Sequence, residues 1–120
     1  MKLFTADIVA RLMENGRKQE PVRGTDGEID FHPVVKLFTP DAGCTWLLTE
    51  IDPEDADIAF GLCDLGLGFP ELGSVSISEI TALRGKLGLP VERDMHFIAD
   101  KTLSAYAEEA SRLGHIKERP

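Results

Sequence analysis

The chain has 120 residues, a net charge of −8 and a sequence pI near 4.8. This length corresponds to one ordinary domain, and we expect residues 1–120 to form a single domain around one core. The 42% hydrophobic and 28% charged residues exclude the disordered and fibrous classes. The acidic balance argues against nucleic-acid binding, because phosphate contacts need a basic face.

The start of the chain does not read as a signal peptide, because Asp7 and Arg11 interrupt the apolar run before a small-residue cleavage site appears. No apolar stretch approaches the ~20 residues needed to cross a bilayer. We therefore expect a cytoplasmic protein with no membrane association. Cys44 and Cys63 would stay reduced in that compartment and serve as small apolar fillers.

The first element predicted is a helix that Thr5 caps and that runs to about Asn15, because apolar residues recur there at helical spacing. Gly16 is the predicted stop. Residues 16–32 show no periodicity and contain a proline and several glycines, so we expect a long mobile loop.

A hairpin is predicted where two alternating apolar runs, 33–38 and 44–51, flank a turn at residues 39–43. In that turn Pro40 presets φ, Asp41 is expected to bond its own backbone, and Gly43 accepts a left-handed conformation. The first run is apolar on both faces, which places its strand inside the sheet. In the second run we expect Trp46 in the core, and Ile51 on the opposite face.

Two further strands are predicted at 58–64 and 73–77, and Gly61 in the first of them indicates a bulge or a close approach. Ser78 then caps a helix of about two turns that ends near Arg84. Residues 91–98 alternate and predict a fifth strand, with Met95 and Phe97 turned inward.

The last predicted helix runs from about Thr102 to Gly114, and residues 115–120 are expected to fray. The order of elements is helix, four strands, helix, strand, helix. This order predicts an α+β fold, in which an antiparallel sheet of about five strands carries an N-terminal helix, a short middle helix and a C-terminal helix.

The sequence predicts no catalytic residue, no cofactor and no metal ion. The acidic residues 52–57 lack the spacing of a calcium loop, and His32, His96 and His115 fit no zinc template. No serine lies in a nucleophile elbow. The glycines of the 66–73 segment are read as an irregular turn, because no helix opens where a dinucleotide loop would need one.

One polar group stands out as a possible interaction patch around an exposed edge, and its members are Arg84, Glu92, Arg93, Asp94 and His96. The alternative interpretation is an ion-pair network that ties the short helix to the last strand.

Four segments resemble one bacterial family, catalogued as domain of unknown function twenty-nine fifty-eight: Val34–Pro40, Thr45–Glu50, Pro70–Gly73 and Leu87–Asp94. The resemblance covers about Phe4 to Phe97. It implies a small cytoplasmic protein of the kind often carried on plasmids and other mobile elements, with no established reaction, cofactor or catalytic residue.

Three functional hypotheses follow. The first is a non-enzymatic accessory protein that binds an unidentified protein partner through the exposed edge and the patch, and serves plasmid or mobile-element maintenance. The second is an acidic antirestriction-type protein whose carboxylates imitate DNA phosphates. The third is a small enzyme or ligand binder that uses Asp64 and a pocket near Gly66–Gly73. The sequence leaves the oligomeric state and the partner open.

Overall fold

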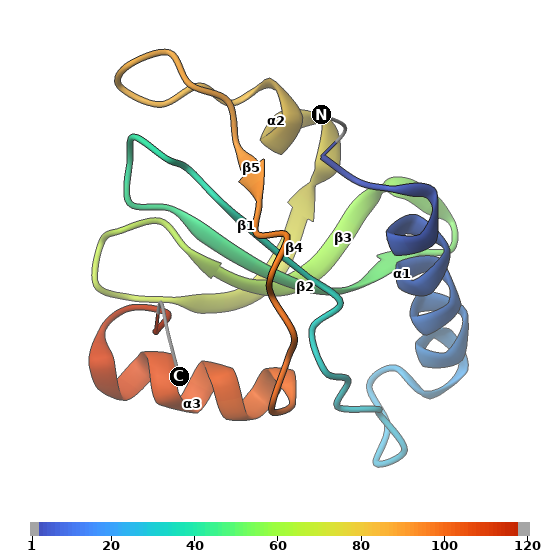
Figure 1. Cartoon of the computed structure of the whole chain (residues 1–120). Coiled ribbons are helices and arrows are strands. Elements are labelled where there is room, and N and C mark those ends of the chain that lie inside the picture. The colour runs from blue at the N-terminus through green and yellow to red at the C-terminus, as the bar shows by residue number, and fades with distance from the viewer. Residues whose placement is uncertain (1–2, 118–120) are drawn as a thin grey trace.

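Within residues 3–117, which this computed structural model describes, five strands form one antiparallel sheet in the order β4-β3-β2-β1-β5 (Figure 1). The strands are β1 (Val35–Phe38), β2 (Thr45–Asp52), β3 (Asp55–Asp64), β4 (Glu71–Ser76) and β5 (Glu92–Arg93). The helices that pack on them are α1 (Ala6–Gln19), the 3₁₀ turn η1 (Glu20–Val22), α2 (Ile77–Ala82) and α3 (Leu103–Leu113). The predicted α+β class, with its N-terminal, middle and C-terminal helices, is confirmed. In this part of the chain no helix has both the length and the apolar character to cross a bilayer.

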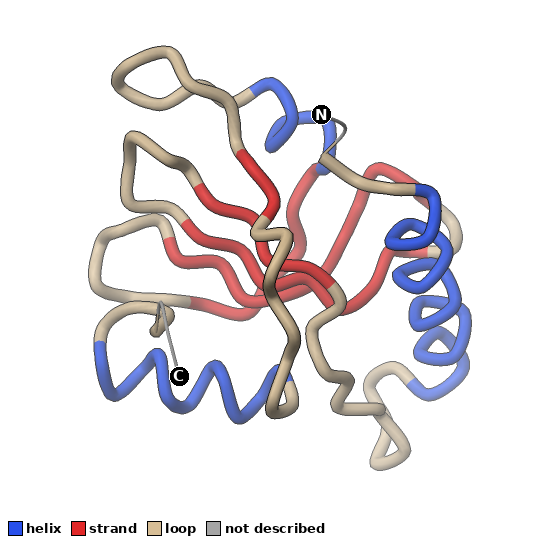
Figure 2. The backbone as a smooth tube through the Cα atoms, in the orientation of Figure 1, coloured by secondary structure: helices blue, strands red, loops and turns tan. Residues whose placement is uncertain are grey.

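Each face of the sheet carries its own hydrophobic cluster, since alternate residues of the central strand β2 point to opposite sides. Trp46 and Leu48 face α1 and pack in the first cluster with Leu12, so the prediction that Trp46 lies in the core is confirmed. Leu47 faces α3 and packs in the second cluster with Leu103. Figure 2 shows α1 and α3 on different sides of the strands. Two clusters therefore replace the single core expected from length.

The predicted hairpin is confirmed, because β1 and β2 pair with Phe38 opposite Thr45. Thr39 closes the turn twice: its N–H donates to the carbonyl of Cys44 at 3.0 Å, and its hydroxyl accepts from the N–H of Cys44 at 2.9 Å. Gly43 does not adopt a positive φ, so its expected left-handed conformation was wrong. The strand β1 also lies inside the sheet, as predicted, with β5 on its other side.

Asp41 at the tip of this hairpin does not bond its own turn. Its carboxylate accepts the N–H groups of Leu87 at 2.6 Å and Leu89 at 3.3 Å, which belong to the loop before β5. The two turns lie side by side, and the amides of the neighbouring loop replace the local bond that Asp41 was expected to make.

Helix α1 continues one turn beyond its predicted stop, because Gly16 serves packing and not termination. A Cβ atom at Gly16 would lie 1.8 Å from the carbonyl oxygen of Ile51, so the missing side chain lets α1 approach β2 closely. At the end of the helix, the amide side chain of Gln19 donates to the carbonyl of Ile29 at 2.7 Å and accepts its N–H at 2.8 Å. Residues 16–32 therefore do not form one long mobile loop. Their first part belongs to α1, and the following segment is held to the end of that helix by the bonds between Gln19 and Ile29.

A bulge in β2 changes the face of the residues that follow it. The register with β3 shifts at Thr49, and Ile51 then lies on the face of Trp46, so its predicted position beside Leu47 was wrong. The close approach predicted at Gly61 is confirmed, because a Cβ atom there would lie 1.9 Å from the carbonyl oxygen of Leu47.

Strands β3 and β4 begin earlier than predicted, at Asp55 and Glu71. The middle helix is capped by Ser76 and not by Ser78, since the hydroxyl of Ser76 accepts the N–H of Glu79 at 3.2 Å. Strand β4 thus passes directly into α2, with no residue left between them.

The fifth strand is much shorter than the predicted 91–98, because a side-chain turn ends it. The carboxylate of Asp94 accepts the N–H of His96 at 2.9 Å, which bends the chain away from β1. Met95 is 69% exposed and not inward as expected, whereas Phe97 packs against the second cluster.

Helix α3 ends as predicted at Gly114, which has a φ of 79°. The tail does not fray at Ile116, which is buried and donates its N–H to the carboxylate of Asp64 at 2.9 Å. The rest of the predicted frayed tail, residues 118–120, lies outside the described residues.

Candidate functional site

The structure divides the predicted interaction patch. Arg84 lies past the end of α2, where its guanidinium donates to the carbonyls of Thr81 at 3.1 Å and Leu83 at 2.8 Å. Arg93 pairs with Leu37 in the sheet and therefore points to the α1 face. Its guanidinium donates to the carbonyl of Leu3 at 2.9 Å.

The other members of the patch lie toward the opposite face. Glu92 pairs with Phe38, and its side chain shares the α3 side of the sheet with Lys36. Asp94 and His96 line a cleft on that side. Asp94 and His96 are therefore brought together, while Arg84 and Arg93 are held elsewhere by backbone carbonyls.

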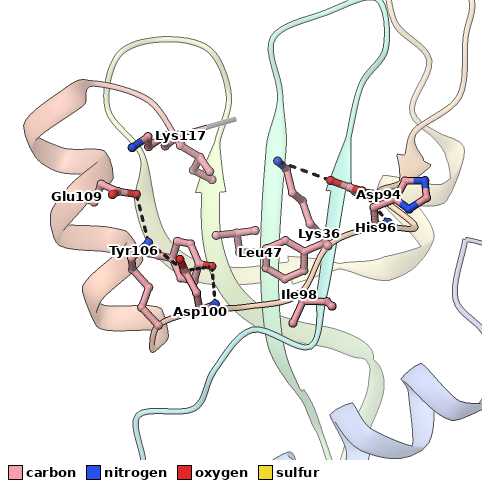
Figure 3. A pocket seen from close by; sticks show the side chains of 12 residues that line it. Lys36, Leu47, Asp94, His96, Ile98, Asp100, Tyr106, Glu109 and Lys117 are labelled. Carbon is pink, nitrogen blue, oxygen red and sulfur yellow. Dashed lines mark hydrogen bonds and ion pairs between the residues drawn. The ribbon is translucent and has the colours of Figure 1, made fainter. Parts of the chain in front are cut away.

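The cleft has a volume of about 390 Å³ and lies between α3 and the segment 94–101, over β1 and β2 (Figure 3). Its apolar lining comes from Ile98, which is exposed, from Phe97, which is partly buried, and from Leu47 and Ile116, which are buried. Charged side chains surround this surface, and they come from β1, the 94–101 segment, α3 and the residues after α3. A volume of this order suits a small ligand or one or two side chains of a partner.

Lys36 supplies a buried cation at one side of the cleft. The residue is only 5% exposed, and its ammonium lies 3.9 Å from the carboxylate of Asp94. Lysine is rarely buried unless it is paired, and the pairing of β1 with β5 brings this carboxylate into reach. Figure 3 shows the two side chains extending toward each other across the strands.

A second charged group closes the other side of the cleft. The hydroxyl of Tyr106 donates to the carboxylate of Asp100 at 2.9 Å, and the ammonium of Lys101 lies 3.1 Å from Asp100 and 3.8 Å from Glu109. Lys101 also lies 4.3 Å from the centroid of the Tyr106 ring. This network ties the segment before α3 to the helix itself.

These contacts move the pKa values of the network in consistent directions. Hydrogen bonds from Lys101 and then from Tyr106 lower the pKa of Asp100, and the bond to Asp100 raises the pKa of Lys101. Burial raises the pKa of Tyr106. The shifts of Asp100 and Lys101 both favour the charged forms that pair with each other, and the shift of Tyr106 favours its protonated form.

The segment proposed as a ligand loop has a structural role. Asp64 is buried, and its two carboxylate oxygens accept the N–H groups of Gly66 and Ile116, each at 2.9 Å. Neither this cleft nor the second cavity, described below, is lined by residues 66–73.

The acidic turn between β2 and β3 does not gather around one point. Asp57 turns toward α2, where it accepts hydrogen bonds from Ser76 and Ser78. Among the described residues, carboxylate oxygens of Glu20, Asp52 and Glu54 lie within 4.8 Å of one another. These groups lie at the surface and resemble ordinary solvated acids.

A family model described as "Protein of unknown function (DUF2958)" matches residues 3–117. This chain belongs to that family. The match confirms the resemblance found in the sequence and extends it over α3. No curated protein and no solved structure matches the chain.

The cleft of this DUF2958 protein includes residues that the sequence did not single out, notably Lys36 and Tyr106. Tyr106 lies on α3, and its polar contact with Asp100 depends on how the 94–101 segment turns. One signal for Lys36 was present in the sequence: a lysine in the middle of a strand that is apolar on both faces must be buried beside a carboxylate or leave the sheet.

Proposed function

We propose that this protein is a binding module that takes up a segment of a protein partner in the cleft beside residues 94–101. One observation carries the proposal: Ile98 lines this cleft and is 87% exposed, beside Phe97, which is only partly buried, while Leu47 in the same lining is buried. Met95, in the same segment, is also largely exposed. Exposed apolar side chains grouped beside a concave surface are typical of interaction sites.

The charges of the cleft indicate what such a segment carries. Among the described residues, three lysines and three carboxylates line it, in a chain whose net charge is −8, so this lining is less acidic than the chain as a whole. Lys36 and Lys101 are paired with carboxylates of the cleft itself. Within residues 3–117, the ammonium of Lys117 has no such pairing. We therefore expect an apolar side chain in the partner, next to an acidic one that meets Lys117.

The lining favours binding over covalent catalysis. The part of it that residues 3–117 form includes no serine, threonine or cysteine, and most of its charged side chains are paired with each other. The mixture of signs also does not favour a DNA mimic at this surface, because imitation of phosphates needs a continuous row of carboxylates.

We further propose that this binding serves plasmid or mobile-element maintenance, a role that rests on the family resemblance. It is tested by comparing how long a plasmid persists in its host with and without this gene. Retention that does not depend on the gene would remove this role and leave the binding role in place.

The binding role is tested with a pair of matched variants. Ile98→Glu puts a charge at the cleft, and Leu87→Glu puts the same charge on an apolar residue of another loop that is 80% exposed. With a photo-crosslinking residue at position 96, we expect the parent and Leu87→Glu to crosslink the same partner, and Ile98→Glu to lose it. An equal yield of that crosslink from both variants would contradict the proposal.

A further inference from the structure

A second cavity lies at the other end of the face that α3 covers. It has a volume of about 360 Å³ and lies between residues 19–28 and the strands β2, β3 and β4. Phe60 and Ile58 provide apolar surface, and Ser74 lies at the outer strand. Among the described residues, this cavity and the cleft share no lining residue, so the two are separate.

A buried carboxylate lies in this cavity because of the bulge in β2. The extra residue Thr49 shifts the register, so that Glu50 pairs with Phe60 and points to the same side as the cavity. Glu50 is only 5% exposed. Bulges of this kind often redirect a side chain next to a functional site.

The contacts of Glu50 leave its charge weakly compensated. Its carboxylate accepts the hydroxyl of Thr49 at 3.2 Å, and the guanidinium of Arg23 lies 3.6 Å away, beyond the usual length of a charged hydrogen bond. Burial raises the pKa of Glu50, although hydrogen bonds from Thr49 and Gln19, and both the charge of Arg23 and a hydrogen bond from it, act in the opposite direction. A buried carboxylate is costly unless well-formed bonds surround it.

Arg23 occupies this position only loosely. Its side chain is 49% exposed, and it belongs to the loop after η1. Among the described residues, the other charged residues that line the cavity are Glu28 and Asp52, so its lining holds three carboxylates and one guanidinium. The cavity therefore has an excess of negative charge beside apolar surface, which is the complement of an organic cation.

We propose that this cavity binds an alkyl guanidinium or alkyl ammonium group, which takes the place of Arg23 at Glu50 and lays its alkyl chain against Phe60 and Ile58. Such a group occurs in free small molecules and in arginine or lysine side chains of proteins. The loop of Arg23 acts as a lid whose own cation fills the site when no ligand is present. This proposal does not depend on the function proposed for the cleft.

The test uses the full chain and n-butylguanidinium, with n-butylurea as the neutral probe of the same shape. We expect saturable chemical-shift changes at the side-chain amide of Gln19 and the backbone amides of Thr49 and Ser74 with the cation only. Arg23→Ala removes the competing cation and should strengthen binding by about two- to fivefold. The same titration with a blocked Ala-Arg-Ala peptide shows whether an arginine side chain of a protein also binds in the cavity.

Two variants separate Glu50 from the general acidity of the region. Glu50→Gln keeps the shape and should weaken binding by about tenfold or more, whereas Glu54→Gln removes the same charge from the exposed neighbouring turn and should have little effect. If Glu50→Gln does not fold, the carboxyl carbon signal of Glu50 in the parent must shift on addition of the cation. Equal binding of the urea, an unchanged affinity in Glu50→Gln or an unshifted Glu50 signal would overturn the proposal.

Discussion

At the scale of single residues, Asp57 joins the beginning of β3 to the beginning of α2. Its carboxylate accepts the hydroxyl of Ser76 at 2.6 Å, and the N–H and hydroxyl of Ser78 at 2.8 Å and 3.0 Å. The bond from Ser76 and then that from the Ser78 amide lower the pKa of Asp57 below its ordinary value of 3.8. The side chain of Asp57 thus fixes the start of α2 to strand β3.

The lowered pKa of Asp57 gives a prediction for stability against pH. A carboxyl group whose pKa is lower in the folded state stabilises the fold above its unfolded value, and this contribution is lost as the pH falls through the folded value. We expect Asp57→Asn to lower the melting temperature at pH 7, and the difference from the parent to shrink below a pH of 3.8. Thermal unfolding across this range measures it, with Asp26→Asn in the exposed loop as the control. A difference that stays constant with pH would show that charge is not involved.

At the scale of elements, the packing of α1 on β2 depends on the missing side chain of Gly16. Alanine favours a helix over glycine by about 1 kcal/mol, but its Cβ would lie 1.8 Å from the carbonyl oxygen of Ile51. We expect Gly16→Ala to lower the free energy of unfolding by about 2–4 kcal/mol, because helix and strand must move apart. Urea unfolding measures it. Gly73→Ala, which meets no atom within 4 Å, should change stability by less than about 1 kcal/mol.

The elements that could be predicted are those whose signal is local. The β1–β2 hairpin follows from turn chemistry between two alternating runs, and α3 follows from its apolar stripe and from Gly114. The predicted length of β5 was wrong, because one hydrogen bond from the amide of His96 to Asp94 turns the chain and ends the strand despite its alternating pattern. The prediction that α1 ends at Gly16 was wrong, because a glycine inside a helical pattern indicates a stop unless the strand that packs against it is known.

The candidate site could be predicted only in part, because its residues are brought together by the pairing of strands. Asp94 and His96 were singled out, but Arg84 and Arg93 were grouped with them because the helix end and the last strand were expected to bring opposite charges together at an exposed edge. Alternation in β5 sends Arg93 to the other face. Lys36 enters the cleft through pairing between β1 and β5, a contact over more than fifty residues that no local pattern contains.

At the scale of the whole molecule, one strand holds both hydrophobic clusters together. Leu47 belongs to the α3 cluster, while Trp46 and Leu48 on either side of it belong to the α1 cluster, and all three are buried. If β2 separated from the helix on one face, the buried side chains of the cluster on the other face would also be exposed. Asp64 adds a second link, because it ties the end of β3 to Ile116 beyond α3.

This shared strand predicts that the two faces unfold together. The chain has one tryptophan and one tyrosine, and Trp46 lies in the α1 cluster while Tyr106 packs against the α3 cluster. We expect the ring signals of the two residues in NMR spectra to disappear with the same midpoint in urea, as in a two-state transition. Leu47→Ala should lower both midpoints equally, at a cost of about 2–5 kcal/mol, although Leu47 faces only α3. If Tyr106 lost its native signal at lower urea than Trp46, α3 would be a separately unfolding unit, and the cleft that it borders would open before the sheet does.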